Sequence, residues 1–548
     1  MRRRMDYLPL AAILLLAAGL RFWSLDFGLP DVRVRPDEQQ VVGAALGFFR
    51  GDFHPGFFHY PSLYLYLLFA VFRLFAWGGI LLGQYDSTDG FLAAMAQDPA
   101  PLYLLDRGLS ATLGVVTVGL VYRLGERLFD RRVGLLAALF LAVTYLHVRE
   151  SHFGVTDVAA TCLLTAAALA VVRAYRQGRP RDFVLAGVWA GLATATKYIG
   201  ILMVAPVVLA VVFRVREEHE PGQRLRRLTV SLVTDRRPWI FLLYLLLAFC
   251  LTTPYALIDF QRFQQDVAFE ARHLEEGHMG LAVPAWRAHL LRTLPHGVGL
   301  PLLALAMAGL VLGFRRSDRD RRQALAVLYL LPLLYLLVAL RGQTAFVRYM
   351  VPLAPFIALA AAQFFALWPA FRSRIHPRAI AALLAIAAVL PPLWNSIRCD
   401  QLLGRADSRV LARQWILKNI PPGTSLAQTG REIPTVQLPP LYDEWRIDIR
   451  SGLFEGKLRR QLPQYLVVED SALEWYNRPI RRISQLPERF YGPVWEVRAA
   501  DLTPEVVARN VYDQQDLFYL PFGGFHGVER PGPNITIYHL GYHSPQKR

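Results

Sequence analysis

The sequence has few cysteines, few charged residues and no recognisable internal repeat. Its three cysteines, Cys162, Cys250 and Cys399, lie far apart among 548 residues, which excludes a disulfide framework and the close spacing of a zinc site. Charged residues make up 19% of the chain, below the roughly 25% that is typical of soluble domains. The lack of a repeat is unlike the repeated halves that many secondary transporters carry.

Long apolar runs take the place of the missing charge. Runs such as 8–20, 300–312 and 379–393 alternate with short, basic, proline-containing connectors. Because every backbone polar group in hydrocarbon needs an internal partner, these runs must be helices. No small-residue cleavage site follows the first run, and residues 21–23 (Arg-Phe-Trp) are typical of an interface anchor. We therefore expect the first run to remain as a transmembrane helix.

The formal net charge of +17 is concentrated in the connectors. The basic clusters are Arg2–Arg4, Arg123–Arg132, Arg173–Arg181, Arg224–Arg237, Arg315–Arg322 and Arg372–Arg378. This pattern follows the positive-inside rule and does not describe a nucleic-acid-binding face, so we expect no nucleic-acid partner. With each cluster placed in the cytoplasm, the chain has about eleven spanning helices, and the remaining loops lie outside.

One apolar segment, Tyr60–Leu82, does not fit this count. It is long enough to cross, but crossing would move the cluster Arg123–Arg132 to the outside. We therefore expect it to lie along the outer interface, where Pro61, Arg73 and its many aromatic residues are well suited.

The composition divides the chain into two domains. Residues 1–398 form an all-α polytopic membrane domain with a first outer loop at 24–102, and residues 399–548 form a small α/β domain outside the membrane. In the second domain, Asp407-Ser408 is expected to cap a helix that runs to Asn419. Short strands are predicted at Tyr465–Val468, Val494–Val497 and Ile535–Leu540.

Acidic residues at the outer level of the membrane are costly to desolvate and are the first candidates for chemistry. Asp37 and Glu38 directly follow the first helix. Asp37 either caps the next helix or is a carboxylate that acts as a base or metal ligand. The second outer loop carries Asp157 and His152. These two are either a helix cap and an interface histidine, or a functional partner of Asp37.

Cations also occur at the outer ends of apolar stretches. Lys197 and the pair Arg348-Tyr349 either extend their polar ends to the interface or point a positive charge at a lipid phosphate. The loop at 254–295 contains an amphipathic helix with Phe263 and Phe269 on its apolar face, whose charged face is most simply a solvated one. No group of residues requires a cofactor, and a divalent metal remains an open alternative.

The order of several motifs resembles that of a known family. They are Asp37-Glu38, His59-Tyr60-Pro61-Ser62-Leu63, Arg107–Ala111, Tyr122–Gly125, Ser151–Asp157, Thr196-Lys197 and Arg348-Tyr349 with Pro352 and Pro355. Their order and common sidedness resemble the dolichyl-phosphate-mannose protein mannosyltransferase superfamily, which includes the bacterial aminoarabinose transferases of lipid A. The resemblance covers most of the membrane part and implies the C-type glycosyltransferase (GT-C) fold with polyprenyl-phosphate sugar donors.

The resemblance also implies roles for individual residues. Asp37 would deprotonate the acceptor hydroxyl or steer it through a bound ion, and Glu38 would support Asp37 or position the acceptor. Asp157 matches the acidic position of the second loop. Lys197 matches the lysine near the donor phosphate. Arg348 is a further phosphate contact.

Four more residues, Tyr349, His152, His59 and Tyr60, are expected to contact substrate. At Tyr60-Pro61-Ser62 the chain departs from the lipid A enzymes, whose loop carries a lysine before paired prolines. This departure argues against aminoarabinose as the sugar and against recognition of the donor phosphate by this loop.

The sequence thus predicts a transferase that moves a sugar, with inversion, from a polyprenyl-phosphate donor to a protein, lipid or glycan acceptor. The expected location is a bacterial inner membrane, in contact with membrane lipid, with the C-terminal domain outside. Two alternatives remain: a secondary transporter or lipid flippase, and a non-catalytic scaffold that keeps the fold. Replacing Asp37 by asparagine separates them, because only a transferase should depend on its carboxylate.

Overall fold

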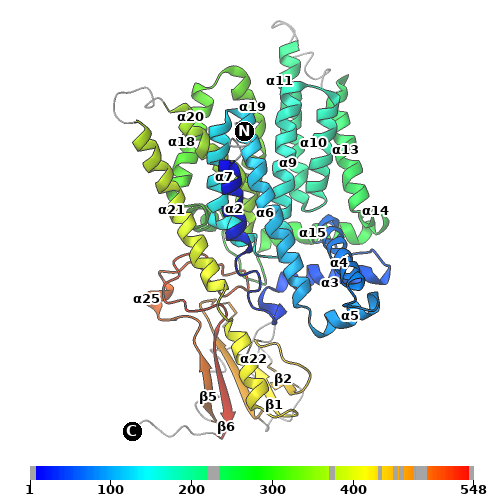
Figure 1. Ribbon diagram of the computed structural model, residues 1–548, viewed down its shortest axis with the longest axis vertical. Coiled ribbons are helices and arrows are strands. Elements are labelled where there is room, and N and C mark those ends of the chain that lie inside the picture. Colours follow the sequence, from blue (N-terminus) through cyan, green and yellow to red (C-terminus); the bar gives the residue numbers. More distant parts are fainter. Residues whose placement is uncertain are drawn as a thin grey trace. The chain divides into compact units, whose positions relative to one another are not determined.

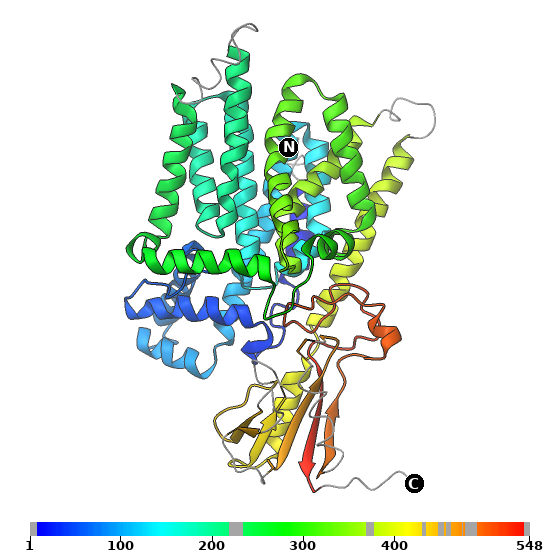
Figure 2. The same ribbon diagram turned by 180° about the vertical axis from the view of Figure 1, so that it is seen from behind.

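The structure is a computed structural model, which describes residues 8–218, 234–368, 377–429, 435–447, 454–455, 462–473, 475–476 and 490–541 (Figures 1 and 2). The cluster Arg2–Arg4 and most of Arg224–Arg237 and Arg372–Arg378 lie outside these residues. Backbone contacts divide the chain into two units. The membrane unit comprises residues 1–23, 40–92 and 102–397, and the C-terminal unit comprises 24–39, 93–101 and 398–548.

The membrane unit is helical. Its helices, some of which continue into the C-terminal unit, are α2 (Leu8–Phe22), α3 (Pro36–Gly47), α4 (Leu63–Leu81), α5 (Thr88–Gln97), α6 (Ala100–Leu128), α7 (Arg131–Val143), α8 (Tyr145–Glu150), α9 (Thr156–Gln177), α10 (Pro180–Thr194), α11 (Val204–Glu218), α13 (Arg236–Thr252), α14 (Tyr255–Ile258), α15 (Phe260–Glu276), α16 (Ala285–Ala288), α17 (Leu294–Val298), α18 (Leu300–Arg316), α19 (Arg319–Arg341), α20 (Ala354–Leu367) and α21 (Pro377–Leu403). Short helical turns are η2 (Phe48–Arg50), η3 (Tyr198–Met203), η5 (His289–Thr293) and η6 (Val347–Leu353).

The long apolar helices pack side by side. Helix α10 packs against α9 and α13, and α20 packs against α18 and α7. Figures 1 and 2 both show α9, α10, α11 and α13 as neighbouring, roughly parallel columns. The chain is therefore a multi-pass integral membrane protein.

Seven helices in the described part of the chain are long and apolar enough to cross a membrane, or eight if the bent pair Ala285–Val298 and Leu300–Arg316 forms one span. The expected number of about eleven includes shorter helices, such as α7 with 13 residues and α10 with 15. That number remains a prediction. Helix α4 is among the seven, so the interface position expected for Tyr60–Leu82 also remains a prediction.

The residues after the first helix differ from the expected anchor. Phe22 and Trp23 are exposed, as an interface anchor requires, but Arg21 is fully buried. Its guanidinium donates to the main-chain oxygens of Leu141 and Ala142 at the end of α7, at 3.1 and 3.0 Å. The last carbonyls of a helix lack the usual i+4 partner, and Arg21 donates to two of them, of which Leu141 also accepts from the Thr144 amide at 3.3 Å. Arg21 therefore links α2 to α7 and does not reach the interface.

The amphipathic helix expected in the loop at 254–295 is α15. Figure 2 shows it running across the ends of the neighbouring bundle helices. The ring of Phe263 on its apolar face lies 5.8 Å from that of Phe58 and 6.0 Å from that of Tyr198. Helix α15 thus provides a platform for the segment before α4.

The C-terminal unit contains a six-stranded sheet in the order β3-β2-β1-β4-β6-β5. Strand β1 pairs in parallel with β2 and β4, whereas β6 is antiparallel to β4 and β5. The strands are β1 (Ser425–Gln428), β2 (Asp443–Ile447), β3 (Phe454–Glu455), β4 (Tyr465–Asp470), β5 (Tyr491–Val497) and β6 (Asn534–Leu540). The three predicted strands correspond to β4, β5 and β6.

Helix α22 (Ser408–Asn419) follows the predicted cap, because the Asp407 carboxylate accepts from the Arg409 amide at 2.9 Å. Its apolar face packs Ala412 and Ile416 against Val467 and Ile537 of the sheet. The short helices η1 (Val32–Val34) and α25 (Pro504–Val507) complete the unit. The fold class is therefore as predicted: a helical membrane part followed by a small α/β part.

A buried carboxylate lies at the end of β4. Glu469 is 2% exposed and accepts hydrogen bonds from the hydroxyls of Thr435, at 3.0 Å, and Tyr519, at 3.2 Å. Burial raises the pKa of Glu469 to about 7, because the apolar surroundings disfavour the charged carboxylate. The carboxyl thus binds its proton more tightly in the folded state than in the unfolded chain.

Close packing of α18 on α20 predicts the effect of a methyl group at Gly309. A β-carbon there would lie 1.8 Å from the Ala360 carbonyl oxygen, so Gly309→Ala should force the two helices apart and destabilise the protein by about 1–3 kcal/mol. Gly119→Ala in α6 is the control, since no atom lies within 4 Å of its β-carbon position. Thermal unfolding in lipid measures both. Equal melting temperatures for the two variants would contradict this packing.

The raised pKa of Glu469 predicts a pH-dependent stability. Since the folded pKa exceeds the unfolded value, stability is greatest below about pH 4.5 and is lost as the pH rises through about 7. Glu469→Gln cannot ionise, so its melting temperature relative to the wild type should increase from pH 5 to pH 8. Thermal scans at both pH values test this, and a difference that does not change with pH would argue against a buried, protonated Glu469.

Candidate active site

An ion pair between Asp157 and Lys197 forms the centre of the site in the membrane unit. Asp157 lies in the first turn of α9, and Lys197 directly precedes η3. The lysine Nζ contacts Asp157 Oδ1, and their side chains are 19% and 4% exposed. A buried lysine needs a nearby negative charge, and the N-terminal end of α9 favours the carboxylate. The two residues that the sequence treated separately therefore form one unit.

Turn η6 lies against this pair through an aromatic ring and also carries a second cation. Lys197 Nζ lies 5.3 Å from the centre of the Tyr349 ring, within the range of a cation–π interaction. The hydroxyl of Tyr335 in α19 donates to the Tyr349 carbonyl. The Arg348 guanidinium lies 4.2 Å from the centre of the Phe346 ring. Turn η6 thus brings the Tyr349 ring to Lys197, while a shared site for Arg348 and Lys197 remains a prediction.

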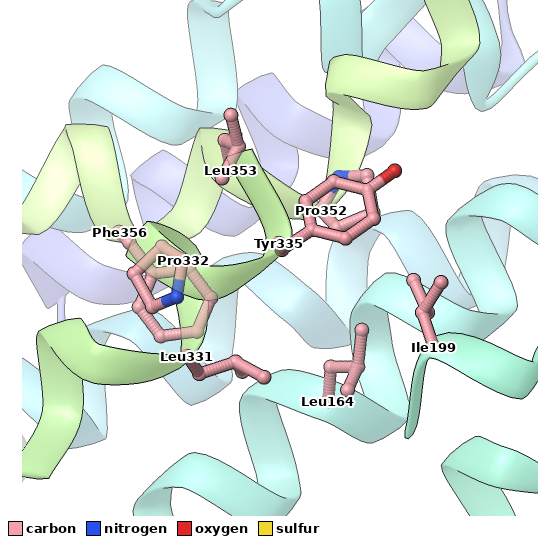
Figure 3. A pocket seen from close by; sticks show the side chains of 8 residues that line it. All are labelled: Leu164, Ile199, Leu331, Pro332, Tyr335, Pro352, Leu353 and Phe356. Carbon is pink, nitrogen blue, oxygen red and sulfur yellow. The ribbon is translucent and has the colours of Figure 1, made fainter. Parts of the chain in front are cut away.

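A small apolar groove lies beside these residues. It is formed by α9, η3, α19, η6 and α20 (Figure 3). Its lining residues are Leu164, Ile199, Leu331, Pro332, Tyr335, Pro352, Leu353 and Phe356. Ile199 is two residues from Lys197, and Tyr335 is the groove residue that bonds to Tyr349. The arrangement joins an apolar groove to a cationic end.

The segment 53–60 lies on α15 beside this site. The Tyr198 hydroxyl donates to the Phe58 carbonyl at 2.6 Å, and the Phe58 amide donates to the Asp266 carboxylate at 2.7 Å. His59 Nδ1 lies 3.0 Å from Glu270 Oε1, and this hydrogen bond raises the pKa of His59 above its usual value. His59 and the neighbouring Tyr60 are both half-buried. Tyr198, the residue after Lys197, therefore connects the ion pair to this segment.

His152 has a structural environment. It is completely buried, and its two ring nitrogens face the main-chain oxygens of Val148, at 3.0 Å, and Trp23, at 2.9 Å. Burial lowers the pKa of His152 to about 4, so the ring is neutral at physiological pH. Both ring nitrogens face the protein main chain, so this geometry gives no support to the substrate contact expected for His152.

Asp37 and Glu38 belong to the C-terminal unit, whereas Lys197 belongs to the membrane unit. Both lie in the first turn of α3, after Pro36, so Asp37 is inside the helix and is not its cap. Asp37 is partly accessible, with 31% of its side chain exposed, whereas Glu38 is fully buried. The Arg35 Nη2 lies 3.9 Å from Asp37 Oδ2. Of the two, Asp37 has the exposure that a base acting on a substrate requires.

Several buried polar residues were not singled out as site candidates from the sequence. The Tyr64 hydroxyl donates to Asp106 Oδ1 at 2.8 Å, and Gly154 lies so close that a β-carbon would be 2.0 Å from Asp106 Oδ2. Arg149 and Glu150, a few residues before Gly154, form a buried ion pair. The signal in the sequence was the charge itself, because buried charges at membrane depth are rare. The groove had no such signal, since its residues are ordinary apolar ones.

A metal site made only of protein ligands does not fit the described residues. Within the parts of the chain that the structure describes, no three or more His, Cys, Asp and Glu side chains are grouped so as to hold a metal ion. The divalent metal that the sequence left open therefore has no assigned ligands.

Comparison with known proteins identifies the fold. Residues 107–257 match the family model of dolichyl-phosphate-mannose-protein mannosyltransferase. No curated protein sequence matches the chain. ArnT from Cupriavidus metallidurans, solved bound to undecaprenyl phosphate, is 14% identical, with a TM-score of 0.52 over 98% of this chain and 99% of that one.

The archaeal oligosaccharyltransferase AglB from Archaeoglobus fulgidus, solved with an inhibitory peptide and a dolichol-phosphate, is 16% identical, with a TM-score of 0.50. The match covers 77% of this chain but only 58% of that enzyme. At these identities the likeness shows the fold alone, while the family model adds a match in sequence. Together they show that the chain has the GT-C fold, with a family match in sequence over residues 107–257.

Proposed function

We propose that the chain is a membrane glycosyltransferase that transfers a sugar from a polyprenyl-phosphate donor to a hydroxyl acceptor at the outer face of a membrane. The observation that carries this proposal is that Lys197, with the Tyr349 ring beside it, adjoins the segments η3 and η6, which line a small apolar groove. A polyprenyl phosphate has the matching form, with an apolar chain and an anionic head. ArnT, which has the same fold, was solved with such a lipid.

Different residues act on the leaving group and on the nucleophile. When the bond between the anomeric carbon and the phosphate oxygen breaks, that oxygen takes the electron pair, and Lys197 and Arg348 stabilise the charge. Asp37 accepts the proton of the acceptor hydroxyl as its oxygen bonds to the same carbon. One displacement without a sugar–enzyme intermediate inverts the anomeric configuration. Asp157 orients the Lys197 ammonium, and Glu38 supports Asp37.

The groove sets what the donor must offer. The groove is small, so it holds at most the part of a long chain next to the phosphate and leaves the rest in the lipid. Binding then depends on the apolar chain near the phosphate and on the phosphate itself. The sugar and the acceptor would be selected on the outer side of the site and not by the groove. We further propose a bacterial inner membrane with the C-terminal unit outside, from the positions of the basic connectors.

Asp37→Asn is expected to abolish turnover. Replacing a general base should lower the rate about 10²–10⁴-fold, because the amide cannot accept the proton. Purified protein in lipid would be given a panel of radiolabelled polyprenyl-phosphate sugars, and sugar released or transferred would be counted. Asp89→Asn, an exposed position in α5, makes the same charge change and should keep wild-type activity. If the wild type turns over no donor, the transporter and scaffold alternatives gain support, whereas an active Asp37→Asn would mean that Asp37 is not the base.

The two members of the ion pair should affect lipid binding differently. Lys197→Met removes a charged hydrogen-bond donor and should weaken binding of polyprenyl phosphate by about tenfold or more. Asp157→Asn breaks the same pair but releases the ammonium, so the lipid should bind as tightly as before or more tightly. Equilibrium binding of radiolabelled polyprenyl phosphate measures both. Equal weakening in the two variants would mean that the pair is structural and that Lys197 does not bind the phosphate.

A further inference from the structure

We propose that Asp516 is a positioning residue for Asp37 and acts through Arg35. The proposal rests on the function proposed for Asp37 and deepens it, because it gives the C-terminal unit a part in the reaction. Asp516 lies far along the chain from Asp37, yet both belong to the C-terminal unit. The residue between them in space is Arg35, which immediately precedes α3.

Arg35 contacts two carboxylates of different accessibility. Its Nη1 donates to Asp516 Oδ1, and its Nη2 lies 3.9 Å from Asp37 Oδ2. The Arg35 and Asp516 side chains are 1% and 6% exposed, while that of Asp37 is 31% exposed. The first contact is a direct ion pair in a dry environment. The second is longer than a hydrogen bond, so Asp37 is held near the cation but is not closed off by it.

The surroundings keep the guanidinium in this position. The Arg35 Cζ lies 5.9 Å from the ring centre of Phe518, two residues after Asp516, and that ring packs edge-on against Phe27. On the other side, Asp31 caps η1 by accepting from the Arg33 amide at 3.0 Å. Contacts on both sides of η1 therefore hold the segment that leads into Asp37 in place.

A third strip of chain holds the same segment. The Val32 amide donates to Gln437 Oε1 at 3.2 Å, and the Gln437 amide donates to Asp31 Oδ2 at 3.4 Å. These reciprocal bonds tie residues 31–32 to the region that follows β1. Contacts from the C-terminal part of the chain thus determine where the first turn of α3 begins.

Competition between the two carboxylates gives Asp516 its role. Arginine stays charged and presents several donors in a rigid plane, so its closest partner decides which edge remains for the other. While Asp516 occupies one edge, the Asp37 carboxylate keeps an open side for the acceptor hydroxyl. If Asp516 becomes neutral, the guanidinium moves toward Asp37 and forms the direct pair there. The Asp37 carboxylate then accepts hydrogen bonds from Arg35 and is oriented away from the acceptor hydroxyl.

The test compares Asp516→Asn with a double variant and a matched control in the full-length protein in lipid. Asp516→Asn should lower kcat by roughly ten- to a hundredfold, as small misplacements of a catalytic group do. The KM for the donor and the affinity for polyprenyl phosphate should stay unchanged. Arg35→Gln/Asp516→Asn removes the competing cation and should have a kcat between those of the single variant and the wild type.

Asp407→Asn is the matched control. It breaks another buried arginine–aspartate pair in the same unit, since Asp407 binds Arg409 at 2.8 Å. Its kcat should stay near the wild-type value, whereas a merely structural effect would lower kcat or protein yield similarly in both aspartate variants. If Asp516→Asn does not fold, the neutral double variant decides alone, and a wild-type kcat there overturns the proposal.

The outcomes also separate this proposal from the function it rests on. Loss of activity in Asp37→Asn together with wild-type kcat in Asp516→Asn overturns only the role of Asp516. A double variant no faster than the single variant has the same consequence. Full activity of Asp37→Asn overturns the role of Asp37 itself.

Discussion

The cost of removing charge from water governs how this protein places its polar residues. An ionised side chain in apolar surroundings is expensive unless an opposite charge or several hydrogen bonds compensate it. The described residues follow this rule in both units. Buried pairs are Arg149 with Glu150 and Lys197 with Asp157 in the membrane unit, and Arg35 with Asp516 and Arg409 with Asp407 in the C-terminal unit. Lys197 with Asp157 and Arg35 with Asp516 each join two distant chain segments, and these two pairs include or adjoin the residues proposed for chemistry.

The same constraint applies to the proposed donor lipid, which combines an apolar chain with an anionic head. A polyprenyl phosphate has an apolar chain that hydrocarbon accepts and a head that hydrocarbon rejects. The groove beside η3 and η6 supplies apolar walls, and Lys197 supplies positive charge where those walls end. Because Asp157 already pairs with Lys197, the lysine is not an isolated cation in these largely apolar surroundings. The phosphate can then share or replace the carboxylate as partner, which makes binding an exchange of anions rather than the burial of a new charge.

Local patterns in the sequence predicted much of the fold. The Asp407 cap, the amphipathic periodicity of α15 and the strands β4 to β6 depend on neighbouring residues, and the structure has them where they were expected. Contacts between distant residues were not accessible in this way. Arg35 and Asp516 are 481 residues apart, and nothing near either residue indicates the other. Arg21 was interpreted as part of an interface anchor because it precedes two aromatic residues, Phe22 and Trp23. Its hydrogen-bond partners, however, lie on α7.

The candidate site was predicted residue by residue but not as an arrangement. Asp157, Lys197 and Tyr349 were each singled out for charge or position, and the structure adds that Lys197 lies against both of the others. The groove is built from ordinary apolar residues and could only be found in three dimensions. Photo-crosslinking of a polyprenyl phosphate with a reactive group in its first isoprene units tests the central claim most directly. The account predicts that the labelled peptides contain Leu164, Ile199, Leu331 or Phe356, whereas labelling confined to lipid-exposed helix faces outside the groove would contradict it.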